Sequence, residues 1–367
     1  MVADSQPRSV LYQTIHSQPE VVRAVLQNAQ GAAKRAAELL TGSRRVFLSG
    51  TGTSGHAAIV GESLLRLAGA DAYATTNFDF ATYPRRLGPD DALVTISHRG
   101  SKRYGAQAIA RAREAGMRVV GVTGQGSPME GQGLDLVIAT APQERSATHT
   151  ASYTANLAAL ALIATRLGER AGGDVGELRL ALDRLPDDIA ALLGRESMVV
   201  PLANALAARG RLTVMGAGPN AATAREGALK VKESSYLSAE GVEVETALHG
   251  YLQAIEADDI VVVVAARGPA LERVGDLVRA LDLIGAQVVV VADERAVDAL
   301  PPLVSVETPG ARTVITYPTV PEALSPLLAV VPLQLLAAHT AACRGADADS
   351  FRADNPVYKK VNESYAL

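Results

Sequence analysis

Short apolar runs alternate with longer amphipathic segments along the whole chain. Runs such as RVVGV near residue 120 and VVVV near residue 290 are continuous rather than alternating, which is typical of parallel strands buried on both faces. Strands are expected near 44–50, 71–76, 91–97, 118–123 and 135–140, and then near 211–216, 259–266, 287–292 and 303–307. Helical segments follow most of them. The pattern predicts an α/β fold of open, mainly parallel sheets with helices on both faces.

Three helical segments are particularly clear. Gln18 and Pro19 begin an amphipathic helix expected to run to about Leu40, with proline in the first turn, where its missing N–H is tolerated. A second helix is expected from Glu226 to about Ala239. Residues 324–342 are nearly all apolar and close to membrane-spanning length, but they include two prolines, a glutamine and a histidine. We therefore expect a buried helix there and no membrane span.

The chain carries an internal repeat. SGTGTS at 49–54 corresponds to MGAGPN at 215–220, SHRG at 97–100 to AARG at 265–268, and VVGVTG at 119–124 to VVVVAD at 288–293. The offset grows slowly, from 166 to 169 residues, as expected for duplicated domains with small insertions. The expected organisation is an arm at 1–29, one domain at 30–165, a linker at 166–195, a second domain at 196–345 and a tail at 346–367.

Composition narrows the class of protein. A chain of 367 residues favours two domains, and a net charge of −4 gives no indication of a nucleic-acid or anionic membrane partner. The single Cys343 cannot form an internal disulfide, which suits a reducing cytoplasm. The N-terminus lacks the apolar core of a signal peptide, so we expect a cytoplasmic protein.

A glycine-rich loop, SGTGTSGH, follows the first expected strand. Glycines allow the backbone to approach an anion closely, and the N–H groups at a helix start can bind it. The spacing differs from dinucleotide and P-loop patterns. Gly52, Thr53 and Ser54 are therefore candidate ligand-binding residues, although Thr53 and Ser54 could also simply cap the helix.

A basic loop, SHRGSKR, follows the strand near 91–97. We expect His98, Arg99 and Lys102 to make it strongly cationic, and Ser97 to add a hydroxyl. Arginine holds phosphate or sulfonate through paired hydrogen bonds, and a cation at a helix start is unfavourable unless an anion binds. Arg103 is expected only to cover the first helical turn.

A third loop, ERSATHT at 144–150, precedes another helix. His149 and Thr150 are candidates for contact with a ligand, and the histidine could equally be a cap or a surface group. No H-x-x-x-H, C-x-x-C or carboxylate cluster with ligand spacing occurs, so we expect no metal and no cofactor.

The segment EGALKVKESSYLSAEGVEVETALHG at 226–250 resembles the EGALKLKE…E…HGP signature of the sugar isomerase (SIS) domain family, best known from the isomerase half of glucosamine-6-phosphate synthase. The glycine-rich loop and the loop at 144–150 resemble sugar-binding loops of the family, whereas the basic loop departs from the S-x-S-G-x-T pattern that the family usually has at its position. The tail resembles the family's P-R-x-L-x-K-V-T-E-T ending. The resemblance implies two tandem SIS domains. It implies that Glu233 moves a proton between sugar carbons, and that His249, 16 residues later, opens the ring. It also implies that Lys360 forms a Schiff base. Lys359 remains an alternative because the spacing from Pro356 is one residue short.

Three function classes follow from this resemblance. The synthase hydrolyses glutamine with an N-terminal cysteine, whereas about 40 residues without cysteine precede the first strand of this sequence, so we expect no glutamine hydrolysis. We expect an aldose–ketose isomerase acting on a hexose with a 6-phosphate, or less commonly a 6-sulfonate. An amino-sugar-6-phosphate deaminase is the alternative. A non-catalytic phosphosugar sensor ranks last, because both catalytic positions are filled. The resemblance also implies a homodimer with sites shared between subunits.

Overall fold

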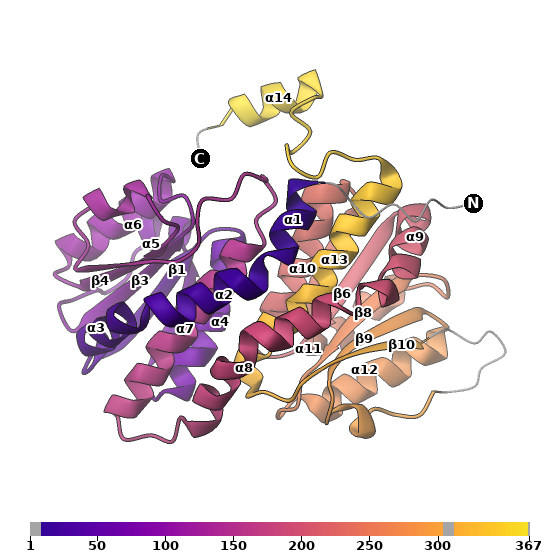
Figure 1. Cartoon of the computed structure of the whole chain (residues 1–367), viewed down its shortest axis with the longest axis horizontal. Coiled ribbons are helices and arrows are strands. Elements are labelled where there is room, and N and C mark those ends of the chain that lie inside the picture. The colour runs from indigo at the N-terminus through magenta and orange to yellow at the C-terminus, as the bar shows by residue number, and fades with distance from the viewer. Residues whose placement is uncertain (1–8, 304–311, 366–367) are drawn as a thin grey trace. The chain divides into compact units, whose positions relative to one another are not determined.

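The computed structural model describes residues 9–303 and 312–365 (Figure 1). It divides into two compact units. The first-sheet unit contains the described residues of 17–145, 149–186 and 352–365, and the second-sheet unit those of 9–16, 146–148, 187–303 and 312–351. The division falls within helix α8 (Gly176–Leu193), at Pro186. The expected linker at 166–195 is thus mostly helical.

Five parallel strands form the sheet of the first-sheet unit, in the order β2-β1-β3-β4-β5. They are β1 (Arg45–Gly50), β2 (Ala72–Thr76), β3 (Asp91–Ser97), β4 (Arg118–Thr123) and β5 (Leu136–Ala139). The α-helices are α2 (Gln18–Asn28), α3 (Gln30–Leu40), α4 (Thr53–Leu67), α5 (Asn77–Thr82), α6 (Arg103–Glu114), α7 (Ala151–Arg170), the first part of α8 and α14 (Pro356–Glu363), with a 3-10 turn at η1 (Pro128–Gly131). The five strands expected in the first half are confirmed, each within one residue at either end.

The strand order reverses between β1 and β3. The chain winds from β1 outward to β2 and then from β3 outward to β5, so right-handed crossovers place their helices on opposite faces. Helix α4 packs with α7, and α5 packs with α6. The carboxyl ends of β1 and β3 are neighbours, with Ser49 paired to Thr95. An open parallel sheet binds ligands at such a reversal point.

The second-sheet unit repeats this topology, with the strand order β10-β9-β8-β6-β7. Its strands are β6 (Arg211–Gly216), β7 (Ser238–Glu243), β8 (Ile260–Ala265), β9 (Gln287–Asp293) and β10 (Arg312–Tyr317). Its α-helices are α1 (Val10–His16), the second part of α8, α9 (Val200–Arg209), α10 (Asn220–Ser235), α11 (Val244–Leu248), α12 (Leu271–Ile284) and α13 (Pro326–Arg344), with 3-10 turns at η2 (Glu196–Met198), η3 (Tyr251–Ala254), η4 (Val297–Ala299) and η5 (Glu322–Leu324). The expected duplicated α/β architecture is confirmed.

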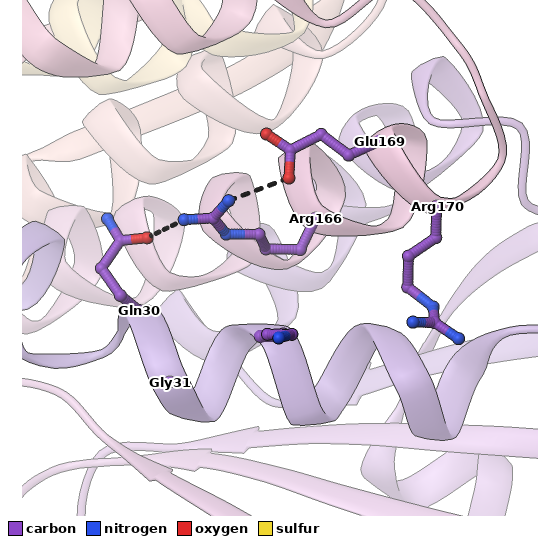
Figure 2. Close-up of a pocket in the computed structure, with 6 residues that line it drawn as sticks. Gln30, Gly31, Arg166, Glu169 and Arg170 are labelled. Carbon is purple, nitrogen blue, oxygen red and sulfur yellow. Dashed lines mark hydrogen bonds and ion pairs between the residues drawn. The ribbon is translucent and has the colours of Figure 1, made fainter.

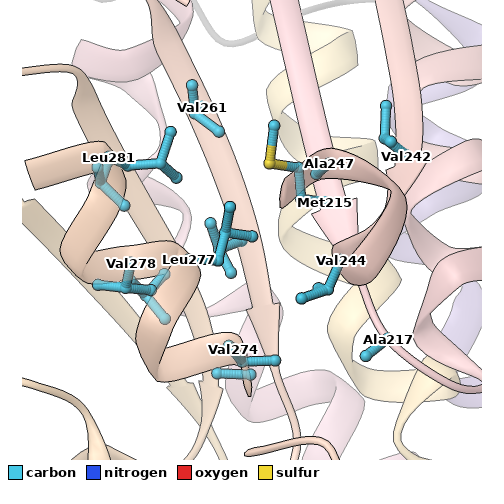
Figure 3. Packing of buried hydrophobic residues seen from close by; sticks show 14 of the residues in the cluster. Met215, Ala217, Val242, Val244, Ala247, Val261, Val274, Leu277, Val278 and Leu281 are labelled. Carbon is cyan, nitrogen blue, oxygen red and sulfur yellow. The ribbon is translucent and has the colours of Figure 1, made fainter. Parts of the chain in front are cut away.

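An apolar layer joins the second sheet to α11 and α12 (Figure 3). Val261 and Met215 on the strands face Leu277 and Leu281 on α12, and all four side chains are fully buried. Valine is favoured in such strands because its branched side chain packs well on a pleated surface. The packed layer holds α11 and α12 against the second sheet.

Helix α13 confirms the buried helix expected over residues 324–342. The segment Glu322–Arg344 is long and apolar enough to cross a membrane, but 89% of its apolar window is buried inside the structure. Helix α13 packs against α10 and α9, which lie beside it in the second-sheet unit (Figure 1). It is therefore a core helix of that unit.

Several element boundaries differ from the predictions. The expected helix 18–40 is two helices, because Ala29 ends α2 and begins α3. The helix expected to reach Ala239 ends at Ser235, where Tyr236 adopts a left-handed conformation with φ of 60°. The chain then forms strand β7, which the sequence analysis missed. The strand expected at 303–307 lies, apart from Leu303, outside the described residues, and β10 begins at Arg312.

Candidate functional site

The glycine-rich loop lies at the carboxyl end of β1 and leads into α4. Gly52 is the N-cap of α4 and has φ of 58° and ψ of −128°, a conformation open mainly to glycine. Because Gly52 has no side chain, it gives the helix no side-chain cap, and no acidic residue lies in the first turn. Thr53 and Ser54 form the first turn and are partly exposed. The start of α4 therefore has the features of an anion-binding helix terminus.

The basic loop follows the neighbouring strand β3, and hydrogen bonds hold it from several sides. The Ser97 hydroxyl accepts the Gly100 N–H at 3.0 Å, and the Gly100 carbonyl accepts from the Gln132 amide at 2.8 Å. Gly100 has φ of 67°, and a Cβ there would lie 1.9 Å from the Ser127 hydroxyl. The loop is therefore fixed before any ligand arrives.

His98 differs from the expectation in its charge. Its side chain is buried, and its Nε2 accepts the backbone N–H of Glu144 at 3.1 Å, so the neutral ring carries its proton on Nδ1. Burial, together with the neighbouring Arg99 charge, lowers the pKa of His98 to about 4. His98 is uncharged at neutral pH, and the expectation that it adds positive charge to the loop is wrong.

The positive charge of this loop comes from arginine and lysine. Arg99 and Lys102 are exposed, and no ion pair of either is found within the described part of the chain. Burial, and then the charge of Arg99, lowers the pKa of Lys102. Lys102 is the N-cap of α6, whose first turn contains no acidic residue. Two cations therefore stand at a helix start, where an anion would be attracted by both charge and dipole.

The third loop, 144–150, is organised by Glu144. Its carboxylate accepts the N–H of Thr150 at 3.0 Å and also that of Ser152, so it caps the start of α7. The His149 ring lies 5.0 Å from the His98 ring, edge to face. Thr150 is completely buried, and its hydroxyl finds no hydrogen-bond partner among the described residues. The first-sheet unit thus brings His149 next to the basic loop.

In the second-sheet unit, helix α10 carries a buried charged cluster. The Lys230 ammonium lies 2.6 Å from a Glu233 carboxylate oxygen and 3.3 Å from that of Glu226. Lys230 and Glu226 are almost completely buried, whereas the Glu233 side chain is 21% exposed. Glu233 is therefore the member of this cluster that a ligand can reach. Lys230 was not predicted as a site residue, although its i,i+4 and i,i+3 spacing from the two glutamates indicates ion pairing.

His249 follows α11 and lies at the end of a chain of polar contacts. Its Nε2 is 2.8 Å from a Glu245 carboxylate oxygen, and Arg273 donates to the same carboxylate at 2.6 Å. Hydrogen bonds from Arg273 and His249 lower the pKa of Glu245 to about 2. The His249 side chain is 71% exposed. An ionised carboxylate thus orients an imidazole that is open to solvent.

The tail is helical where the sequence analysis described only a polar segment. Asn355 caps α14 by accepting the Val357 N–H at 2.9 Å. Lys359 and Lys360 are both exposed on this helix. Consecutive helical residues point about 100° apart, so the two lysines face different directions. Neither lysine is singled out by its surroundings.

A cavity of about 370 Å³ lies away from these loops, between α3 and α7 (Figure 2). Its lining residues are Gln30, Gly31, Lys34, Arg166, Glu169 and Arg170. Arg166 is held by Glu169 at 2.9 Å and by Gln30 at 2.6 Å, as Figure 2 shows. None of the predicted site residues lines it.

These features define an α/β protein with two similar open sheets, one of which ends in a preformed cationic loop. The chain belongs to the SIS domain family, whose model matches residues 39–166 and 205–344. A glutamine–fructose-6-phosphate aminotransferase (isomerizing) of Gloeobacter violaceus is 31% identical over 362 residues, covering 94% of this chain and 58% of that protein. The chain thus spans little more than half the length of the curated relatives it matches.

Solved structures share the fold. The C-terminal domain of glucosamine-fructose-6-phosphate aminotransferase from Francisella tularensis has a TM-score of 0.85 at 19% identity, covering 94% of this chain and 98% of that one. Tagatose-6-phosphate ketose/aldose isomerase from Escherichia coli gives 0.72 at 19% identity (92% and 95% covered). Glucosamine-6-phosphate deaminase from Thermotoga maritima gives 0.70 at 18% identity (93% and 97% covered). At these identities the likeness establishes the fold alone.

Proposed function

We propose that the protein is an aldose–ketose isomerase that acts on a hexose with an anionic group on C6. The observation that carries the proposal is Glu233, a partly exposed carboxylate held by the buried ammonium of Lys230. A positioned carboxylate is suited to proton transfer between carbons. Membership of a family with phosphosugar-processing relatives supports the substrate class.

The proposed reaction needs no external oxidant or reductant. His249 assists ring opening by moving a proton between the anomeric hydroxyl and the ring oxygen, which gives the free aldehyde. Glu233 removes the proton from C2, and the electron pair forms the C1–C2 double bond of an enediol while the aldehyde oxygen O1 gains a proton. The proton on Glu233 then returns to C1, and the C2 hydroxyl loses its proton as it becomes a carbonyl, which balances the proton gained by O1. A neutral amine of Lys360, or of Lys359, would condense with the C2 carbonyl of the open ketose and release water, and hydrolysis of this Schiff base by one water would free the ketose again.

The anion is assigned to the basic loop, with Ser97, Arg99 and Lys102 around it and with Gly52, Thr53, Ser54, His149 and Thr150 contacting the rest of the sugar. His98 would contribute only a neutral N–H. A phosphate is the first choice and a sulfonate the second, because both present oxygens that match paired arginine donors.

Arg99→Ala should raise KM for the anionic sugar about 10- to 100-fold, the effect of losing one charge-assisted hydrogen bond. The matched control is Arg103→Ala, which removes an exposed arginine from the same segment. Steady-state kinetics with a hexose 6-phosphate, and with the same hexose lacking the C6 anion, measure the effect. An unchanged KM in Arg99→Ala would mean that the loop only caps α6.

His249→Gln should lower the rate with a cyclic hexose phosphate about 10²-fold or more, since general acid–base assistance at ring opening is lost. The rate with an aldotetrose 4-phosphate, which cannot close a stable ring, should fall much less. Glu245→Gln should cause a smaller loss in the same direction. It removes the charged carboxylate that lies 2.8 Å from His249 Nε2 and orients the imidazole. Equal losses on both substrates would remove the ring-opening role.

Deamination of an amino-sugar phosphate is the second candidate, because it uses the same ring opening and proton transfer. One screen separates the two. C1–C2 isomerisation and ammonia release are measured across hexose 6-phosphates, their 2-amino forms and 6-sulfonates. Ammonia release without isomerisation of any neutral sugar would favour the deaminase, and binding without turnover of any of them would favour a sensor.

A homodimer with shared sites also belongs to this proposal, as do the domain ranges 30–165 and 196–345. Sedimentation at micromolar concentration tests the dimer. A monomer with full activity would contradict the shared site.

A further inference from the structure

A short segment between α13 and the tail, Asp347–Asp349, binds three separate parts of the second-sheet unit. The Asp349 carboxylate accepts the Val10 N–H on Oδ2 and the Leu11 N–H on Oδ1, both at 2.8 Å. These two amides begin helix α1, so one side chain from the end of the chain satisfies the start of the first helix. Each carboxylate oxygen accepts one backbone N–H, so a hydrogen-bond donor in place of either oxygen would face another donor.

The same segment holds the loop that leads into His149 and Thr150. The Asp349 carbonyl accepts the Ala147 N–H at 2.9 Å, and the Ala348 carbonyl accepts the Thr148 hydroxyl at 2.9 Å. Thr148 and Ala348 are buried. The loop is therefore joined to this segment by two hydrogen bonds, of which the one between Thr148 and Ala348 is shielded from water.

The third attached element is the end of helix α10. The Tyr236 hydroxyl donates to the Asp347 carbonyl, and Tyr236 ends the helix three residues after Glu233. Within the segment, the Asp347 carboxylate accepts the Asp349 N–H at 3.0 Å and the Ser350 hydroxyl. The segment is thus rigid in itself and attached to three fixed elements.

The tail begins immediately after this attachment. Phe351 and Arg352 have φ of 50° and 57°, a left-handed conformation that non-glycine residues rarely adopt. Two such residues in succession persist only where the surrounding structure holds them. Lys359 and Lys360 follow these two residues in the tail.

We propose that Asp349 is a positioning residue that anchors the segment before the tail to α1, to the loop 146–148 and to the end of α10, and that the tail lysine depends on this anchor for reaction. This inference rests on the proposed function for its kinetic consequence, and the attachment itself is tested without activity. Simple capping of α1 does not account for the contacts. The Ser9 hydroxyl already accepts the Tyr12 N–H at 3.2 Å, and the Asp349 backbone holds a different element.

The test compares Asp349→Asn with Ser9→Ala. Asparagine places an NH₂ group against one of the two N–H donors, whereas Ser9→Ala removes an α1 cap and leaves the tail attachment intact. Asp349→Asn should lower kcat about 10- to 100-fold, the cost of misplacing a reacting group, while Ser9→Ala should stay within about threefold of the parent. In a background with both tail lysines replaced by alanine, Asp349→Asn should have little further effect.

The chain contains no tryptophan, so Val357→Trp gives a single reporter on α14. Its fluorescence anisotropy should fall in the Asp349→Asn variant and stay unchanged in Ser9→Ala, whether or not the protein is an isomerase. Tyr236→Phe removes one attachment without burying a new group and should give a smaller fall. Should Asp349→Asn fail to fold, a fall in Tyr236→Phe alone still supports the attachment.

Three results would overturn the proposal. The first is that Asp349→Asn and Tyr236→Phe both have the same anisotropy and the same kcat as the parent. Another is an equal effect of Asp349→Asn and Ser9→Ala, which would reduce Asp349 to a helix cap. The last is an undiminished loss of kcat when the lysines are absent. If the parent protein is inactive but the anisotropy changes are as expected, the proposed function is wrong and the attachment through Asp349 is supported.

Discussion

Glu233→Gln is expected to lower kcat by about 10²- to 10⁴-fold, the usual contribution of a general base. Glutamine has nearly the same shape, and its side-chain oxygen can still accept the hydrogen bond that Lys230 donates at 2.6 Å. The fold and the ligand affinity should therefore remain. Steady-state kinetics give kcat, and direct titration with the sugar phosphate gives Kd for the inactive variant.

The matched control for Glu233→Gln is Glu240→Gln, which removes an exposed carboxylate from strand β7, five residues after the end of α10. It should keep kcat within about twofold of the parent, since exposed substitutions away from a site rarely matter. If Glu233→Gln retains a third or more of the parent activity, Glu233 is not the base.

Lys230→Met should destabilise the protein by about 3–5 kcal/mol, because it leaves buried Glu226 without its cation at 3.3 Å. Methionine fills a similar volume, so the loss reports charge and not a cavity. Activity should fall as well, because Glu233 loses the donor that fixes its carboxylate. The midpoint of urea unfolding measures the stability.

Two companion variants separate charge from packing at Lys230. Lys232→Met, on an exposed position of the same helix, should leave the midpoint nearly unchanged. Adding Glu226→Gln to Lys230→Met should restore part of the stability, since the uncompensated buried charge is then removed. A midpoint for Lys230→Met equal to that of Lys232→Met would contradict a stabilising role for the buried cluster.

Much of the sheet architecture follows from the sequence because continuous apolar strands bury both faces and leave few alternatives. Strand β7 was missed for the opposite reason. It is an edge strand that reads SAEGVE, with exposed Ser238 and Glu240, and its apolar residues continue the helical pattern before it. Only the left-handed Tyr236 ends α10, and tyrosine carries no sequence signal for that conformation.

The candidate site was partly predictable. Loops after parallel strands must meet at one sheet edge, so the glycine-rich and basic loops could be placed together from their order alone. The uncharged state of His98 could not be predicted from the sequence. It depends on burial and on the Glu144 N–H, which lies 46 residues further along the chain. Lys230 was hidden because a lysine within a helix is usually solvated, and only the fold shows that this one is enclosed.

Because His98 is neutral, the pH dependence of KM can distinguish a phosphate from a sulfonate bound at the basic loop. With the pKa of His98 at about 4, the imidazole of this loop does not titrate between pH 5 and 8. A phosphate monoester gains its second charge near pH 6, whereas a sulfonate keeps one charge throughout. In a His149→Gln background, KM should fall as pH rises through 6 for a 6-phosphate and remain level for a 6-sulfonate. The difference between the two pH profiles then reports whether the loop prefers the phosphate dianion, because the groups of the protein act on both substrates.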